Sequence, residues 1–254
     1  IVGVLVAQNF GADNKAGITD AVEQGVIAAT IMSIPVMLLV WYLGPVLEYA
    51  KQDKEVIRLI TDYSRPLTWT VLPALWFVVF RNFVTALAKS SVIMTITIVA
   101  LLLNLALNYT LVFGKFGFPA LGVVGAAYGT TIVNWLIFLF LTVHIFTSER
   151  FADYQIAIIP RRINYKTLKE IFVLGLPVTV TQMLAGTMFT FAAILVGTIS
   201  ADVLAAQMII YSVIYLAFSI PVALGDAVRV RIASGIGMRS ADAARQSGHI
   251  SFFL

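Results

Sequence analysis

Two asparagines four positions apart interrupt the apolar stretch LLLNLALNYT, residues 101–110. On a helix, Asn104 and Asn108 lie about one turn apart, so both amides project from the same face. An amide surrounded by hydrocarbon needs a hydrogen-bond partner, which a packed neighbouring helix or a wet cavity supplies. The pair therefore indicates either a contact between helices or one wall of a polar pathway.

A second group of polar residues follows the stretch GVVGAAYG at 122–129. The small residues of this stretch allow another helix to approach closely, which is the simpler interpretation of them. Thr130, Thr131 and Asn134 then add hydroxyl and amide groups on the next apolar segment after the asparagine pair.

A third group lies in LGLPVTVTQMLAGTMF, where Thr181 and Gln182 come shortly after Pro177. A proline inside a helix frees a backbone carbonyl and indicates a bend, so these side chains could line a cavity wall. Threonine hydroxyls also bond back to their own helix, and Gln182 could join two helices. We assign Gln182 to the candidate substrate or ion pathway and leave both alternatives open.

Catalytic and metal-binding patterns are missing from the sequence. No Asp or Glu lies in the middle of any predicted membrane span, although ion-coupled transport usually needs an intramembrane carboxylate. His144 and His249 are isolated, and there is no metal-binding His/Glu motif, nucleophile elbow or phosphate loop. We therefore predict no enzyme, no catalytic residue, no metal site and no cofactor.

The elements that must position these residues are membrane-spanning helices. The chain has 60% hydrophobic and 12% charged residues and a mean hydropathy of +0.93, well outside the range of soluble domains. Its apolar runs reach the length of about 20 residues that a helix needs to cross a bilayer. We predict an all-α polytopic membrane protein with a partial span at 1–7 and full spans at 26–47, 66–87, 92–113, 121–146, 171–196 and 203–225.

The positive charges predict the orientation of these spans. Alternating the spans places twelve Lys and Arg residues on one side and five on the other. The richer side is predicted to be cytoplasmic, and the net charge of +4 reflects topology and not binding to nucleic acid. The cytoplasmic set is Lys15, Arg81, Lys89, Arg150, Arg161, Arg162, Lys166, Lys169, Arg229, Arg231, Arg239 and Arg245.

The loops predicted between the spans suggest an internal repeat. The polar stretches 8–25 and 234–248 each follow an apolar span and share a Gly near the start, an Ala-Asp pair and a Gln near a closing Gly. If the similarity is real, one loop occurs twice, about half a transporter apart. The segment 147–170 between two long spans is predicted to link two lobes, 1–146 and 171–254.

At this point the sequence resembles the multidrug and toxic compound extrusion (MATE) transporters, within a wider group that includes lipid-linked sugar flippases. The resemblance covers nearly the whole chain in the family's order, and it is the ordered set of motifs that is specific. The stretches that carry it are VAQNFGADN at 6–14, LNLALNYTLVFGKFGFPALGVVGAAYGTT at 103–131, VLGLPVTVTQMLAGTMFTFAAILVG at 173–197 and IPVALGDAVRVRIASGIG at 220–237.

The resemblance implies twelve helices in two pseudo-symmetric bundles, of which this chain would run from the end of the second to the start of the ninth. The amino-terminal lobe, 1–146, would lack its first helix, 147–170 would be the cytoplasmic linker, and 171–254 would be part of the carboxy-terminal lobe. The family's amino-lobe polar cluster falls on Asn104, Asn108 and Thr130.

One family feature is missing. NorM-like members carry a Glu eight residues after the proline of the seventh helix, and Ala185 occupies that position. Cation coupling through that carboxylate cannot occur in this chain. The asparagines are expected to support a charge and not to carry one.

The resemblance implies a secondary antiporter that exports organic, cationic or amphipathic compounds in exchange for H⁺ or Na⁺ by alternating access. The expected partners are small organic substrates and membrane lipids, with no nucleic acid. The expected protein is a monomer when full length, in a bacterial-type inner membrane. The alternatives are a lipid-linked oligosaccharide flippase of the same wider group and a non-transporting membrane subunit.

Overall fold

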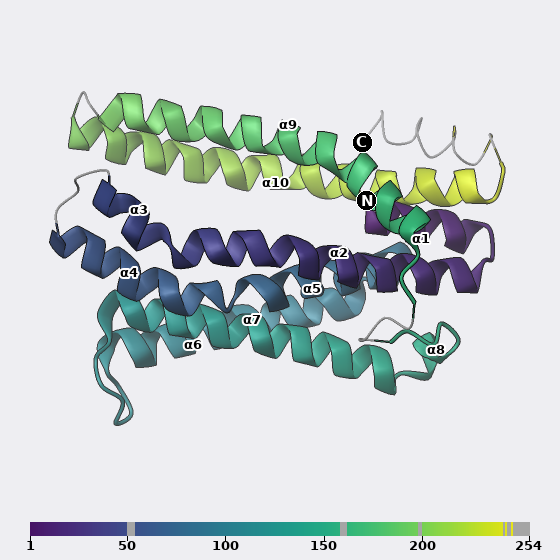
Figure 1. Cartoon of the computed structure of the whole chain (residues 1–254), viewed down its shortest axis with the longest axis horizontal. Coiled ribbons are helices and arrows are strands. Elements are labelled where there is room, and N and C mark those ends of the chain that lie inside the picture. Colours follow the sequence, from purple (N-terminus) through teal and green to yellow (C-terminus); the bar gives the residue numbers. More distant parts are fainter. Residues whose placement is uncertain (50–53, 158–161, 198–199, 241, 243–244, 246–254) are drawn as a thin grey trace. The chain divides into compact units, whose positions relative to one another are not determined.

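The computed structural model describes residues 1–49, 54–157, 162–197, 200–240, 242 and 245, and all regular structure in this part of the chain is helical (Figure 1). Arg161 and the rest of 158–161, within the predicted linker, lie outside the described residues, as do 246–254. The helices are α1 (Val2–Gly11), α2 (Lys15–Trp41), α3 (Leu43–Tyr49), α4 (Lys54–Thr68), α5 (Val71–Ala86), α6 (Ser91–Phe113), α7 (Gly122–Thr147), α8 (Glu149–Ala152), α9 (Tyr165–Gly197) and α10 (Ala201–Gly237).

Five of these helices are long and apolar enough to cross a membrane: α2, α6, α7, α9 and α10. The consecutive helices α4 and α5, which meet at a bend of 42°, form a sixth span if they are counted as one. The prediction of an all-α protein with several membrane spans is confirmed, because each predicted full span falls within or largely within one of these elements.

The predicted boundaries of several loops were wrong. Most of the predicted loop 8–25 is helical, because α1 runs to Gly11 and α2 already begins at Lys15. The predicted loop 48–65 contains most of α4, and α10 continues to Gly237, far into the predicted loop at 226–248. Charged residues end an apolar run but do not have to end a helix. The helix provides hydrogen bonds for the backbone N–H and C=O groups outside the hydrocarbon core of the membrane as well as inside it.

The chain forms two compact units. One consists of α1 with the chain from Tyr165 onward, including α9 and α10, and the other runs from Lys15 to Asn164. Helix α9 begins at Tyr165, so the last residues of the predicted linker 147–170 belong to that helix. The lobe boundaries given above stay a prediction.

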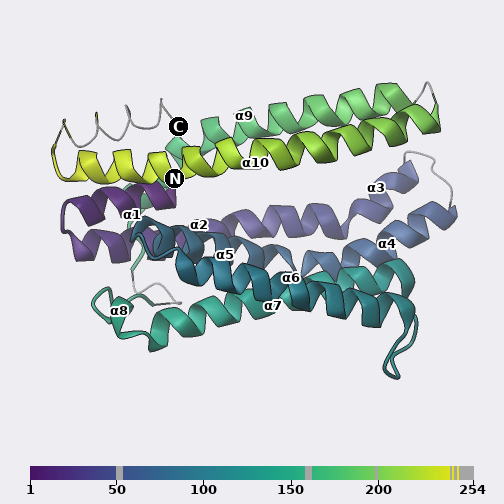
Figure 2. The same cartoon turned by 180° about the vertical axis from the view of Figure 1, so that it is seen from behind.

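In the unit from Lys15 to Asn164, α5 packs against both α2 and α7 (Figure 2). Aromatic side chains of α5 and α7 meet in this core. The rings of Phe80 and Phe138 stack with centroids 6.0 Å apart, and Trp76 lies 5.3 Å from Phe138. The Trp76 indole donates a hydrogen bond of 3.0 Å to the hydroxyl of Thr30 on α2. This core fixes α7 and thereby the face that α7 presents to α6.

The other unit contains a hairpin of two long helices, α9 and α10, which run side by side (Figures 1 and 2). The Phe189 ring on α9 meets the Tyr211 and Tyr215 rings on α10 at centroid distances of 5.5 and 6.3 Å. Helix α10 starts with a side-chain cap, in which the Ser200 hydroxyl accepts a hydrogen bond from the Val203 amide at 3.2 Å. Both helices continue through a proline, Pro177 in α9 and Pro221 in α10.

Candidate functional site

The asparagine pair on α6 forms one hydrogen-bonded unit. The Asn108 amide nitrogen donates to the Asn104 amide oxygen at 3.0 Å, as expected for two amides one turn apart on one helix face. Both side chains are half-buried. The Asn108 oxygen itself is buried and accepts no hydrogen bond from the described residues. The pair therefore leaves one buried acceptor, in an apolar segment, without a partner among the described residues.

Helix α7 approaches this pair at Gly129. A Cβ atom added to Gly129 would lie 2.6 Å from the Asn108 oxygen, which is closer than Cβ contacts occur in proteins. A residue larger than glycine would therefore push the amide or the helix away. The small residues before Thr130 serve the close packing of α6 and α7, as the simpler sequence interpretation had it.

Thr130 lies next to this contact, but its hydroxyl is used within its own helix. It donates to the Ala126 carbonyl at 2.9 Å, and the Asn134 amide nitrogen donates to the Thr130 carbonyl at 2.9 Å. The hydrogen bonds of the described residues include none between Thr130 and the asparagine pair. Thr130 thus lies beside Gly129 in the sequence of α7, but its hydroxyl is bonded to the backbone of α7 itself and not to α6.

A break in the neighbouring span faces the same part of α7. Pro73 has no amide hydrogen and cannot bond the Trp69 carbonyl four residues earlier, and the Trp135 indole donates to that carbonyl at 3.1 Å. The Thr131 hydroxyl lies 2.9 Å from both the Pro66 carbonyl and the Ala127 carbonyl of its own helix, and 2.8 Å from the Thr70 hydroxyl. Since Thr131 has a single hydrogen to donate to a carbonyl, Thr70 is the donor of the hydroxyl pair. Side chains of α7 therefore satisfy the backbone at the bend between α4 and α5.

Gln182 is exposed on α9, which belongs to the other compact unit. The neighbouring Thr181 hydroxyl donates to the Pro177 carbonyl at 2.9 Å. The alternative of bonding within the helix therefore holds for Thr181. Ala185, at the position of the family's glutamate, is exposed on the same helix.

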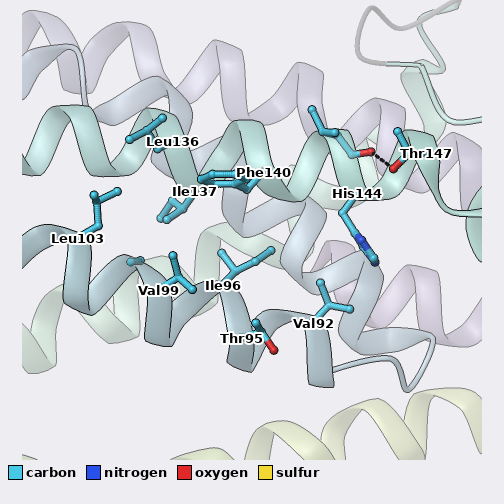
Figure 3. A pocket seen from close by; sticks show the side chains of 12 residues that line it. Val92, Thr95, Ile96, Val99, Leu103, Leu136, Ile137, Phe140, His144 and Thr147 are labelled. Carbon is cyan, nitrogen blue, oxygen red and sulfur yellow. Dashed lines mark hydrogen bonds between the residues drawn. The ribbon is translucent and has the colours of Figure 1, made fainter.

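An apolar cavity of about 480 Å³ lies between the first half of α6 and the second half of α7 (Figure 3). It ends at Leu103, one residue before Asn104, and neither asparagine lines it. Such a surface suits the apolar body of a compound or an acyl chain and offers little to bind a charge. The lining residues are Val92, Thr95, Ile96, Val99, Ala100, Leu103, Leu136, Ile137, Phe140, Val143, His144 and Thr147.

Two buried polar residues on α2 escaped the sequence analysis. Glu23 is only 6% exposed and Gln24 is fully buried, yet both precede the span that the sequence predicted to start at residue 26. The Gln24 amide nitrogen donates to the Arg162 carbonyl at 2.8 Å, and Glu23 lines a polar cavity with Asp20 and Arg162. Polar residues at 20, 23 and 24, spaced as on one helix face, were the available indication. Glu23 is thus a buried carboxylate on a membrane-spanning helix.

The chain after α7 docks on the same end of this unit. The Lys89 ammonium donates to the Arg150 carbonyl at 2.9 Å and lies 4.7 Å from the centre of the Phe151 ring. The Lys15 ammonium contacts the Asp153 carboxylate at 2.7 Å. This hydrogen bond and the lysine charge lower the pKa of Asp153 below its usual value. The part of the chain that the structure describes contains no cluster of three or more His, Cys, Asp or Glu that could hold a metal ion.

Comparison with known proteins decides the family. The family model described as MatE matches residues 2–110, which include both asparagines. The chain belongs to the MatE family. Members of this family are transporters and not enzymes, which confirms the prediction that this protein is not an enzyme.

Relatives of this MatE chain are named for multidrug resistance. It is 32% identical over 253 residues to the "Probable multidrug resistance protein NorM" of Bradyrhizobium diazoefficiens, covering 100% of this chain and 54% of the relative. It is 29% identical over 246 residues to the "Multidrug resistance protein NorM" of Vibrio cholerae, covering 97% of this chain and 54% of the relative. The MatE chain thus spans about half the length of the curated relatives it matches.

The fold of the MatE chain is that of solved MATE transporters. The crystal structure of a eukaryotic MATE transporter superposes with a TM-score of 0.83 at 23% identity, covering 99% of this chain and 55% of that one. At this level of identity the similarity concerns the fold. It confirms the all-α membrane architecture expected from the sequence.

Proposed function

We propose that the full-length protein is a secondary antiporter that exports organic cationic or amphipathic compounds by alternating access, driven by inward flow of H⁺ or Na⁺. The observation that carries the proposal is the buried Asn108 oxygen, which accepts no hydrogen bond from the described residues of this MatE chain. An amide oxygen accepts a hydrogen bond from an N–H of a cationic compound, or coordinates a hard cation such as Na⁺. The multidrug resistance names of the relatives support the substrate class.

Asn104 supports Asn108 in this role. It accepts the hydrogen bond from the Asn108 amide nitrogen at 3.0 Å, which holds the Asn108 side chain in one rotamer. An oriented amide presents its oxygen without first losing side-chain entropy, which favours binding. Thr130 on α7 and Gln182 on α9 are the further pathway positions in this proposal, although neither bonds the pair.

Substrates would be small organic compounds and no cofactor would be needed, since the coupling ion supplies the energy. The predominance of Lys and Arg on one side supports insertion in a bacterial-type inner membrane with that side cytoplasmic. The proposed protein works as a monomer in contact with membrane lipids. Glu23, a buried carboxylate on α2, is a candidate for the acid that the predicted spans lack.

The direct test is drug resistance in an efflux-deficient bacterial host that expresses the full-length protein. Asn104→Leu and Asn108→Leu should abolish resistance at equal membrane expression, because leucine removes the oriented acceptor. Thr97→Val on the same helix is the matched control, since the Thr97 hydroxyl is exposed and bonds only the Ile93 carbonyl of its own helix. Resistance retained by both asparagine variants would show that the pair only packs α6 against its neighbours.

The coupling ion is tested in everted membrane vesicles. A Na⁺ gradient and a pH gradient are imposed separately, and drug-induced dissipation of each gradient is measured. Antiport requires that one gradient collapses faster when drug is added. Failure of both gradients to respond would refute the antiport mechanism while leaving the family assignment intact.

A further inference from the structure

The ends of α1 and α10 have the same backbone geometry. In α1, the amides of Ala12 and Asn14 donate to the carbonyls of Gln8 and Asn9 at 3.0 and 2.9 Å. In α10, the amides of Met238 and Ser240 donate to the carbonyls of Ser234 and Gly235 at 3.0 and 3.2 Å. The pairs of equivalent residues are Gln8 and Ser234, Asn9 and Gly235, Gly11 and Gly237, Ala12 and Met238, Asp13 and Arg239, and Asn14 and Ser240.

The left-handed residue of this cap recurs too. Asp13 has a φ of 52° and Arg239 has a φ of 54°, and both are preceded by a helix that ends with glycine at the same position. The bonding pattern is that of a Schellman-type cap, which satisfies the last helix carbonyls within the segment. The two helix ends thus repeat in backbone geometry, but they align Ala12 and Asp13 with Met238 and Arg239 and not with the Ala-Asp pair at 241–242, so the sequence repeat at 8–25 and 234–248 stays a prediction.

These two ends contact each other through their backbones, within the unit formed by α1, α9 and α10. A Cβ atom added to Gly11 would overlap the carbonyl of Ser234, and one added to Gly237 would overlap the carbonyl of Gln8. The contact is therefore reciprocal: Gly11 lies against the backbone of Ser234, three residues before Gly237, and Gly237 lies against the backbone of Gln8, three residues before Gly11. Such a reciprocal arrangement is the signature of a two-fold related contact. It is also the way in which small residues let membrane helices approach closely.

We propose that this glycine crossing is the contact that closes the transport pathway on the cytoplasmic side, and that it must part for the pathway to open there. The inference rests on the proposed alternating-access function. The family resemblance assigns α1 to the amino-terminal lobe and α10 to the carboxy-terminal lobe, so the crossing would join the two lobes. Both helix ends lie on the side that the positive charges assign to the cytoplasm.

The chemistry of the crossing suits a contact that opens and closes. The end carbonyls are already bonded inside each cap, so separation of the helices loses none of those hydrogen bonds. Backbone atoms at van der Waals distance attract only at short range, and no side chain of Gly11 or Gly237 can bridge a widened gap. The crossing is therefore either closed or parted, and parting it breaks no cap.

The first test widens the crossing by one methyl group. Nitroxide labels are placed at the exposed equivalent positions Phe10 and Ile236 of the full-length protein, and their separation is measured by pulsed electron resonance. Gly11→Ala and Gly237→Ala should each raise the ratio of long to short distances on the order of tenfold, the factor that mild overpacking gives in an equilibrium. Gly225→Ala on α10 is the matched control, because nothing lies within 4 Å of a Cβ added there. Unchanged distances in both glycine variants would overturn the proposal.

The second test locks the crossing without enlarging either glycine. The chain contains no cysteine, so Gln8→Cys with Ser234→Cys provides one defined pair for a reducible bifunctional thiol reagent. Cross-linking should reduce transport by about tenfold or more relative to the same variant before treatment, and reduction of the reagent should restore it. Full transport by the cross-linked protein would show that the contact is static.

The outcomes separate the two proposals. Wild-type protein that moves no drug would refute the proposed function, whatever the labels report. If the wild-type protein transports drug, but the alanine variants leave the label distances unchanged and the cross-link leaves transport unchanged, the proposed role of the glycine crossing alone would be refuted.

Discussion

Polar side chains are used differently in the two compact units. Between Lys15 and Asn164 some of them join helices: Trp76 bonds Thr30, and Thr131 and Trp135 bond the backbone at the bend between α4 and α5. Other hydroxyls of this unit, such as those of Thr97 and Thr130, bond their own helix. On α9 four threonines each bond the carbonyl four residues earlier in the same helix: Thr179, Thr181, Thr187 and Thr190. Side chains that bond another helix hold the helices together. Hydroxyls that bond their own helix leave the helix surface free for other contacts.

Burial follows the same division. In the most apolar window of α7, 33% of the residues are buried, compared with 6% in α9 and none in α10. Helix α6 is an instructive exception, because it belongs to the scaffold unit but is also only 6% buried. Its asparagines bond each other, so α6 presents oriented polar groups on a largely exposed helix.

The largest effect is expected where α6 and α7 approach most closely. Gly129→Ala places a methyl group 2.6 Å from the Asn108 oxygen, and overpacking of this kind destabilises by about 1–3 kcal/mol. The measurement is the free energy of unfolding in detergent, with drug resistance recorded in parallel. Gly186→Ala on α9 is the control, since nothing lies within 4 Å of its added Cβ, and it should be neutral or slightly stabilising. If Gly129→Ala and Gly186→Ala lowered the free energy of unfolding equally, close packing at Gly129 would not distinguish the unit that contains α6 and α7 from the unit that contains α9.

A smaller loss is expected at the bend between α4 and α5. Thr131→Val keeps the shape of the side chain but removes the hydroxyl that the Pro66 carbonyl and the Ala127 carbonyl of its own helix share, and with it the acceptor for Thr70. Hydrogen bonds between membrane helices are worth about 0.6 kcal/mol on average, and leaving a buried group unsatisfied raises the loss to about 1–2 kcal/mol. Thermal unfolding of the purified protein measures it. A melting temperature equal to that of wild type would mean that the bend does not depend on α7.

The overall architecture could be predicted because bilayer thickness sets the length of an apolar helix. The asparagine pair could be predicted because a spacing of four residues places two side chains on one helix face. At the bend between α4 and α5, the missing amide hydrogen of Pro73 frees the Trp69 carbonyl. What the sequence did not show is that Trp135, far along the chain, supplies the replacement donor.

The helix ends could not be predicted from hydropathy. Asp20, Glu23 and Gln24 were predicted to lie in a loop because they precede an apolar run, yet they lie inside α2. Glu23 is buried because residues after α7 cover this face, as the bond from Gln24 to the Arg162 carbonyl shows. Such coverage comes from chain segments about 140 residues apart, so no local pattern contains it.

The counterpart of Thr131 on the hairpin unit should respond much less. Thr181→Val removes only a bond to the Pro177 carbonyl of the same helix, so the expected change in unfolding free energy is within about 0.5 kcal/mol. Measured beside Thr131→Val, it tests whether bonds within a helix and bonds between helices differ as the two units suggest. A loss as large as that of Thr131→Val would indicate that the α9 hydroxyl has a tertiary role.

The smallest effect concerns the exposed ion pair between Lys15 and Asp153 at 2.7 Å. The lysine lowers the pKa of Asp153 below its ordinary value of 3.8, so the folded protein holds this carboxylate charged more strongly than the unfolded chain does. The stabilisation is therefore fully present above pH 3.8 and disappears as the pH falls through the lowered pKa. Because both side chains are more than half exposed, solvent and salt screen the pair and the effect is small. Asp153→Asn should lower the melting temperature slightly at neutral pH and low salt, and the difference from wild type should vanish on acidification; a difference that grows in acid would contradict this ion pair.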